Sequence, residues 1–176
     1  MLRKNLIIGM MFLFALSLVS NSLSAAGKKD LVDWETFKGA WFEVFYPSDF
    51  IVRTSLVSKN KPGQIDSVFF SPLNRSVEFY AFAPLYGYDP EDIQIKSNEN
   101  LVSTSEKKKN SIITKTTILS DKEGKYNRTI IDVTNTGPRN TFARQIFGFK
   151  YVDQRTFDAF NKIFQKFVKS YVPVEK

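Results

Sequence analysis

The sequence predicts an α+β domain in which a long C-terminal amphipathic helix covers one face of an antiparallel β-sheet. Between residues 40 and 152, short segments alternate apolar with polar residues and are separated by turn residues, a pattern typical of antiparallel strands. After Asp153, apolar residues instead recur in steps of three and four, as they do on one face of a helix. The residues before this domain have the pattern of an export signal.

The first 26 residues have the three parts of a cleavable secretory signal peptide. Arg3-Lys4 forms a positive head, residues 6–19 form an apolar run, and Ser24-Ala25-Ala26 places small residues before a cleavage site at Gly27. The alternative is an uncleaved membrane anchor, but a spanning helix needs about 20 apolar residues and this run is shorter. We therefore expect residues 27–176 to be exported, to the periplasm or the cell exterior, as one domain.

The composition limits how the domain is stabilised and what chemistry it can perform. The chain has no cysteine and no histidine, which excludes disulfides, lipid attachment to a cysteine, the usual zinc sites and a Ser-His-Asp triad. Its 17 Phe, 7 Tyr and 2 Trp provide apolar area for a packed core. Residues 27–176 carry 23 basic and 18 acidic side chains, a net charge of +5. This modest excess permits peripheral association with an anionic surface, but we expect no nucleic-acid partner.

The strands are expected in a meander with turn residues between them. Pro47-Ser48-Asp49 and Asp121-Lys122-Glu123-Gly124 are two such turns, and the glycine of the second suits a position of positive φ. The least regular part is 84–110, which could hold a short helix or strand and in which the run Lys107-Lys108-Lys109 is predicted to be a loop. A short segment containing Trp34 precedes the first strand. The expected strands are residues 40–46, 50–57, 65–71, 76–83, 112–119, 125–134 and 141–152.

The C-terminal helix has both a start signal and an end signal. The side chain of Asp153 can cap its N-terminus, and Pro173 stops it. Lys162, Lys166 and Lys169 occupy the side opposite its apolar face, so we expect the apolar face to pack on the sheet. That face consists of Phe157, Phe160, Ile163, Phe164, Phe167, Val168 and Tyr171.

Two groups of side chains are candidates for ligand binding. Aromatic residues at the end of one strand and in the next loop either line a cleft or close the end of the core. Arg139 and Arg144 flank a second aromatic run, and Arg144 shares a strand face with Lys150, which makes either an anion site or a solvated face. The first group consists of Tyr80, Phe82, Tyr86 and Tyr88.

The acidic residues do not define a metal or catalytic site. Asp89, Glu91 and Asp92 are the densest group, and they could bind Ca²⁺ through oxygen atoms or form a turn that begins a short element. Their spacing lacks the alternating acids and the glycine of a calcium loop. The chain also has no glycine-rich nucleotide motif. We therefore assign no metal, no cofactor and no catalytic residue.

The order of the motifs is similar to that of the PsbP-like group of exported proteins. The similarity is carried by WFEVFYPSDF (residues 41–50), DSVFFSP (66–72) and GFKYVDQ (148–154), which is followed by the aromatic helix. This resemblance, over residues 34–172, implies an α/β/α sandwich with helices on the faces of the sheet and a non-enzymatic binding or assembly role. Some photosynthetic members have metal sites that involve histidine. Because this chain has no histidine, the resemblance implies neither a metal nor a photosynthetic role here.

Three functional hypotheses follow from these observations. The favoured one is an exported, non-enzymatic binding or protein-interaction module whose partner or ligand lies outside the cytoplasm, because catalytic side chains are scarce. The second is a carrier of a small apolar or amphipathic ligand in a cavity between the sheet and the C-terminal helix. The third is a hydrolase that uses carboxylates.

The signal peptide leads to a direct prediction. After expression of the full chain in an export-competent bacterium, the exported protein should begin at Gly27, because the small residues before it fit the cleavage site. N-terminal sequencing and the intact mass measure this. A protein that is recovered from the membrane with Met1 still attached would contradict the prediction.

Overall fold

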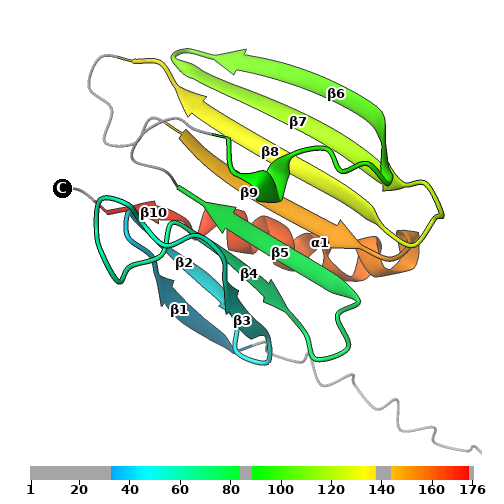
Figure 1. Ribbon diagram of the computed structural model, residues 1–176, viewed down its shortest axis with the longest axis horizontal. Coiled ribbons are helices and arrows are strands. Elements are labelled where there is room, and N and C mark those ends of the chain that lie inside the picture. Colours follow the sequence, from blue (N-terminus) through cyan, green and yellow to red (C-terminus); the bar gives the residue numbers. More distant parts are fainter. Residues whose placement is uncertain (1–32, 84–88, 138–143, 175–176) are drawn as a thin grey trace, which may run out of the picture. The chain divides into compact units, whose positions relative to one another are not determined.

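In the residues that the computed structural model describes, 33–83, 89–137 and 144–174, the main sheet has seven strands (Figure 1). Their order is β3-β4-β5-β9-β8-β7-β6, and all neighbours are antiparallel. The predicted signal peptide lies outside the described residues, so its presence and cleavage stay predictions. The strands are β3 (Ile51–Thr54), β4 (Ser67–Ser71), β5 (Val77–Phe82), β6 (Glu99–Lys109), β7 (Ile112–Asp121), β8 (Asn127–Asn135) and β9 (Arg144–Tyr151).

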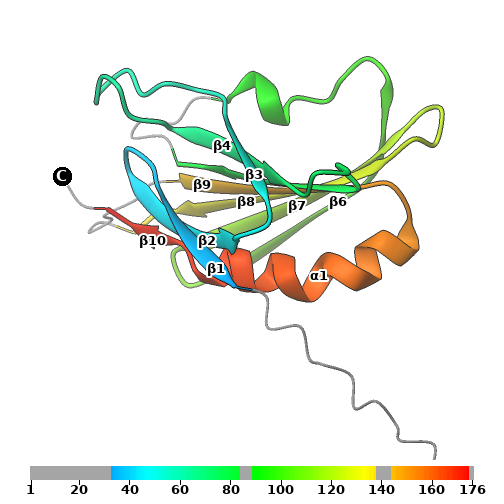
Figure 2. The ribbon, with the colours of Figure 1, turned by 90° about the horizontal axis from the view of Figure 1, so that it is seen from below.

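A helix and a small second sheet cover one face of the main sheet (Figure 2). The helix is α1 (Gln154–Lys169), and the small sheet has the order β1-β2-β10. Tyr46 of β2 stacks on Phe70 of β4 with ring centroids 4.7 Å apart, which joins the two sheets. The strands of the small sheet are β1 (Trp34–Lys38), β2 (Phe42–Pro47) and β10 (Val172–Pro173).

Aromatic rings fill the interface between the main sheet and α1. Phe79 of β5 lies with its ring centroid 5.2 Å from that of Phe164 and 5.4 Å from that of Phe167, both on α1. Phe149 of β9 stacks on Phe164 at 4.8 Å. These side chains are at most 1% exposed, so the interface is close-packed as protein cores are. Packed rings therefore occupy the place where the second hypothesis put a ligand cavity.

The C-terminal helix confirms its predicted start and apolar face but ends earlier than predicted, so Tyr171 lies beyond it and Pro173 lies in β10. The backbone N–H of Thr156 donates to Asp153 Oδ1 at 2.7 Å, which is the expected N-terminal cap. Phe164 and Phe167 of the apolar stripe are buried, and Lys162 is exposed. The helix ends at Lys169, before the strand that contains Pro173.

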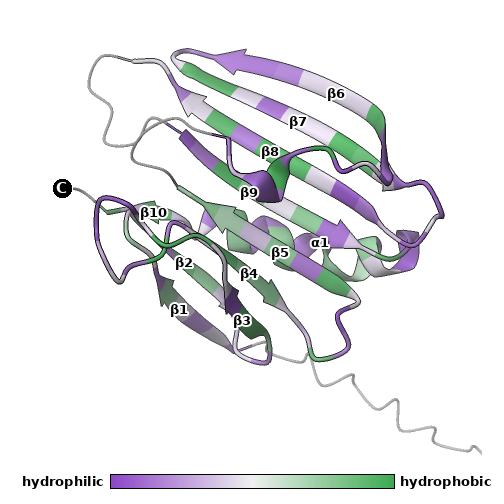
Figure 3. Cartoon of the chain, viewed as in Figure 1, coloured by the Kyte–Doolittle hydropathy of each residue, from purple (hydrophilic) through white to green (hydrophobic). Residues whose placement is uncertain are grey.

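The strands form a simple meander only in part, because the strand expected at 40–46 (β2) belongs to the small sheet and β5 pairs with β9. Two single strands also differ from the prediction. Lys107–Lys109, predicted to be a loop, belong to β6, an 11-residue strand at the edge of the sheet. Every residue of β6 after Glu99 is exposed. A strand with no buried face does not need alternating apolar residues, and β6 lacks the alternation that identifies strands in a sequence (Figure 3). The strand expected at 50–57 is shorter, because β3 covers only Ile51–Thr54.

One irregularity in β6 sets which side chains face which side of the sheet. Leu101 is opposite Leu119 of β7, and Ser103 is opposite Ile118, so Val102 is an extra residue in a β-bulge. Because of this residue, Leu101 and Thr104 lie on the same face although they are three positions apart. That face is the one opposite α1.

Candidate functional site

A segment with little regular structure crosses the face of the sheet opposite α1 (Figures 1 and 2). We call residues 89–98 the crossing segment; it includes the short 3₁₀ helix η1 (Glu91–Ile93). Arg128 of β8 lies beneath it and donates from Nη1 to the carbonyl oxygen of Asp92 at 2.7 Å and from Nη2 to that of Gln94 at 2.8 Å. A single side chain of the sheet thus pairs backbone carbonyls that no strand or helix satisfies.

The same guanidinium forms a buried ion pair with Glu99 at the start of β6. Arg128 Nη2 lies 2.6 Å from Glu99 Oε2, which also accepts the backbone N–H of Lys96 at 2.9 Å, and Glu99 Oε1 accepts the hydroxyl of Tyr126 at 3.1 Å. Burial raises the pKa of Glu99, but the Lys96 N–H and the Arg128 guanidinium outweigh it, so the pKa of Glu99 is lowered overall. Glu99 is therefore a charged and fully engaged anchor.

The turn between β7 and β8 holds the far end of the crossing segment. The side-chain amide of Asn98 donates to Asp121 Oδ1 at 2.7 Å, and the Lys122 ammonium donates to the carbonyl of Ser97 at 2.8 Å. The segment is thus fixed at its C-terminal end by several independent bonds.

Tyr80 and Phe82 close the core on this face of the sheet. Tyr80 is 4% exposed, Phe82 has no exposed surface, and both pack in a small apolar cluster with Leu119, Ile130 and Ile146. The hydroxyl of Tyr80 lies 3.4 Å from Asp92 Oδ2, which also accepts the hydroxyl of Ser55 at 2.8 Å. Of the other candidates, Tyr86, Tyr88 and Arg139 lie outside the described residues.

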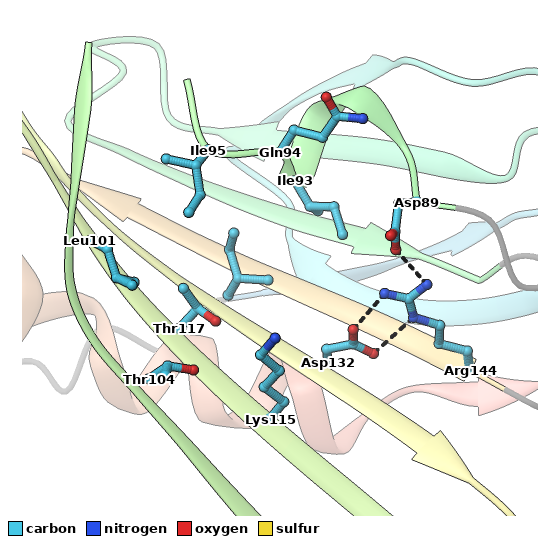
Figure 4. A pocket seen from close by; sticks show the side chains of 11 residues that line it. Asp89, Ile93, Gln94, Ile95, Leu101, Thr104, Lys115, Thr117, Asp132 and Arg144 are labelled. Atoms are coloured by element: carbon cyan, nitrogen blue, oxygen red, sulfur yellow. Dashed lines mark hydrogen bonds and ion pairs between the residues drawn. The ribbon is translucent and has the colours of Figure 1, made fainter. Parts of the chain in front are cut away.

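An open cleft of about 480 Å³ lies between the crossing segment and the outer strands of the sheet (Figure 4). Its floor is built by strand register, because Thr104, Thr117 and Ile130 are cross-strand neighbours on β6, β7 and β8. Lys115 and Asp132 form the next pair along these strands. The lining residues are Asp89, Ile93, Gln94, Ile95, Leu101, Thr104, Lys115, Thr117, Ile130, Asp132 and Arg144.

Arg144 organises the charged end of the cleft. Its Nε and Nη2 contact the two carboxylate oxygens of Asp132 at 3.0 and 2.6 Å, and Nη1 lies 2.7 Å from Asp89 Oδ1. Hydrogen bonds to Asp132 are the main reason why the pKa of the Arg144 guanidinium is raised. Asp132 is 19% exposed and bound through two oxygens, whereas Asp89 is 67% exposed. Exposed ion pairs contribute only about 0–1 kcal/mol, so the Asp89 contact is the weaker one.

The structure brings together only some of the residues that the sequence singled out. Arg144 and Lys150 do share a strand face, as predicted, but Lys150 lies over the ring of Tyr126, 4.2 Å from its centroid, and does not line the cleft. Lys115 and Asp132 had no sequence signal beyond strand alternation. Asp89 and Asp92 have separate partners, and among the described residues no group of three or more His, Cys, Asp or Glu is arranged to hold a metal ion.

Comparison with solved structures finds chains of similar fold. No family model matches the chain, and no curated protein matches it. The solution structure of cyanobacterial PsbP (CyanoP) from Synechocystis sp. PCC 6803 is similar with a TM-score of 0.46 and 12% sequence identity, over 86% of this chain and 99% of that chain. The family resemblance of the sequence motifs stays a prediction. Within the described parts of the chain, no helix has the length and apolar character needed to cross a membrane.

The buried ion pair leads to a stability prediction. Arg128→Met should lower the free energy of unfolding by about 3–5 kcal/mol, because it leaves the Glu99 carboxylate buried without its partner. Urea denaturation measures this. The control is Arg53→Met, which removes an exposed pair with Glu78 and should cost about 1 kcal/mol or less. Equal losses in the two variants would contradict the anchoring role of Arg128.

The lowered pKa of Glu99 leads to a pH prediction. A carboxylate with a depressed pKa in the folded state stabilises the protein above its unfolded pKa, about 4.3, and loses this contribution as the pH falls through the folded value. The stability difference between the wild type and Glu99→Gln should therefore be largest near pH 7 and shrink below about pH 4.3. Chemical denaturation of both proteins across this range tests it; a difference that does not change with pH would contradict it.

Proposed function

We propose that the chain is an exported, non-enzymatic binding protein and that the cleft beneath the crossing segment is its ligand site. The observation that carries the proposal is the cleft itself, because its volume of about 480 Å³ falls in the usual range of small-molecule sites. Export is supported by the N-terminal sequence pattern.

The charged groups of the cleft favour binding over catalysis. Asp89 and Asp132 both contact the guanidinium of Arg144, whereas a carboxylate-based hydrolase needs two carboxyl groups that flank its substrate. The chain also has no histidine or cysteine that could act as a nucleophile or proton shuttle.

The lining of the cleft favours a small amphipathic ligand over a protein surface. Ile93, Ile95 and Leu101 contribute aliphatic surface, and Arg144 and Lys115 contribute charge, within one concave site. Concave sites with an apolar lining and a few placed polar groups are typical of small-molecule binding. The carrier hypothesis thus moves from the helix side of the sheet to its opposite face.

The ligand site can be tested by filling it. In methyl NMR spectra of residues 27–176, a set of small amphipathic compounds should include members that shift the methyl signals of the cleft residues Ile93, Ile95 and Ile130, and Thr117→Phe should abolish these shifts because it fills the floor.

The matched control is Thr116→Phe, which changes the neighbouring residue on the opposite face of β7 and should leave the shifts intact. The proposal is wrong if no compound shifts the cleft methyl signals, or if the shifts persist unchanged in Thr117→Phe.

A further inference from the structure

The two ends of the cleft differ in chemistry (Figure 4). Arg144, Asp132 and Asp89 lie together at one end, and Ile95 and Leu101 lie at the other. A ligand that matches both ends must carry a polar group on an apolar body. The sign of that polar group follows from the charges that are available to it.

Lys115 supplies a positive charge that is not neutralised by an ion pair. Its ammonium group points into the cleft (Figure 4), and among the described residues no carboxylate lies within ion-pair distance of it. Its cross-strand neighbours are Glu106 and Asp132, and Asp132 is bound to Arg144 through both oxygens. An anionic group in the cleft would therefore meet an available ammonium donor.

Asp89 marks the position of a second anion contact. Its carboxylate occupies Nη1 of Arg144 from the crossing segment, and it is mostly exposed to solvent. An exposed contact of this kind exchanges readily for another anion, whereas the two-point contact with Asp132 holds the guanidinium in place. The four charges of the cleft sum to zero, so replacing the Asp89 carboxylate by one ligand carboxylate keeps the site neutral.

We propose that the cleft binds an amphipathic monocarboxylate. Its carboxylate displaces Asp89 from Arg144 and is also bound by Lys115, and its hydrocarbon part lies against Ile93, Ile95 and Leu101. This inference rests on the proposed function, since it names the ligand class of the same cleft. Asp89 then acts as an internal competitor that leaves Arg144 when the ligand arrives.

The test compares three probes of equal length on residues 27–176: hexanoate, hexanamide and hexylammonium. Hexanoate should shift the methyl signals of Ile93, Ile95 and Ile130 and bind about tenfold or more tightly than either of the others, because only it pairs a negative charge and two acceptor oxygens with both cations. Ile112, at the end of β7 and outside the cleft lining, should not respond.

Two variants should change hexanoate affinity in opposite directions. Lys115→Met should weaken binding by about tenfold, and Lys107→Met, on the other face of the sheet, should leave it unchanged. Asp89→Asn should tighten binding by about threefold or more, because the competing carboxylate is gone. A merely structural role of Asp89 would give the opposite sign.

The outcomes separate the inference from the proposed function. Equal affinities of the three probes, or weaker binding to Asp89→Asn, would overturn the monocarboxylate assignment while the cleft remained a ligand site. Cleft shifts from other amphipathic compounds but none from hexanoate would overturn it in the same way. If no compound of any class shifted the cleft methyl signals, the proposed function itself would fail.

Discussion

The Arg128 guanidinium is the contact on which the exposed face of the sheet depends. It replaces the hydrogen bonds that the crossing segment cannot make as part of a strand, and it neutralises Glu99 where β6 begins. The backbone carbonyls of a loop that passes over a sheet need hydrogen-bond donors, because an unpaired buried carbonyl is unfavourable. The Arg128 side chain donates hydrogen bonds to two carbonyls and one carboxylate. The crossing segment is therefore held above the outer strands, with the cleft between the segment and these strands.

The two faces of the main sheet differ in how they are packed. On the α1 side, aromatic rings such as Phe79 and Phe164 supply the packed core that a chain without cysteine needs. The opposite side combines a smaller apolar cluster, buried polar contacts such as the Arg128–Glu99 pair, and an open cleft. Lys115 is exposed and belongs to neither apolar cluster, so Lys115→Met can probe the cleft without disturbing the core.

The sequence was informative where the structure depends on local patterns. The cap at Asp153 and the period of the helix identified α1, and strand alternation placed Arg144 and Lys150 on one face. It was silent where register between distant strands decides the outcome, since Lys115 and Asp132 become neighbours only when β7 pairs with β8. The edge strand β6 was missed because both of its faces are polar and exposed, so no period appears.

The extra residue Val102 shifts the alternation of side chains between the two faces of β6 by one position. Before it, odd-numbered positions face the side of the crossing segment, so Glu99 reaches Arg128 and Leu101 reaches the cleft; after it, even-numbered positions do so, beginning with Thr104. A regular strand of the same length, without the bulge, would turn Thr104 to the face opposite Glu99 and Leu101, and it could not contribute to both the ion pair and the cleft floor. Deletion of Val102 would instead restore regular alternation and leave Glu99, Leu101 and Thr104 on one face, so the bulge adds a residue to the exposed edge without changing the cleft floor.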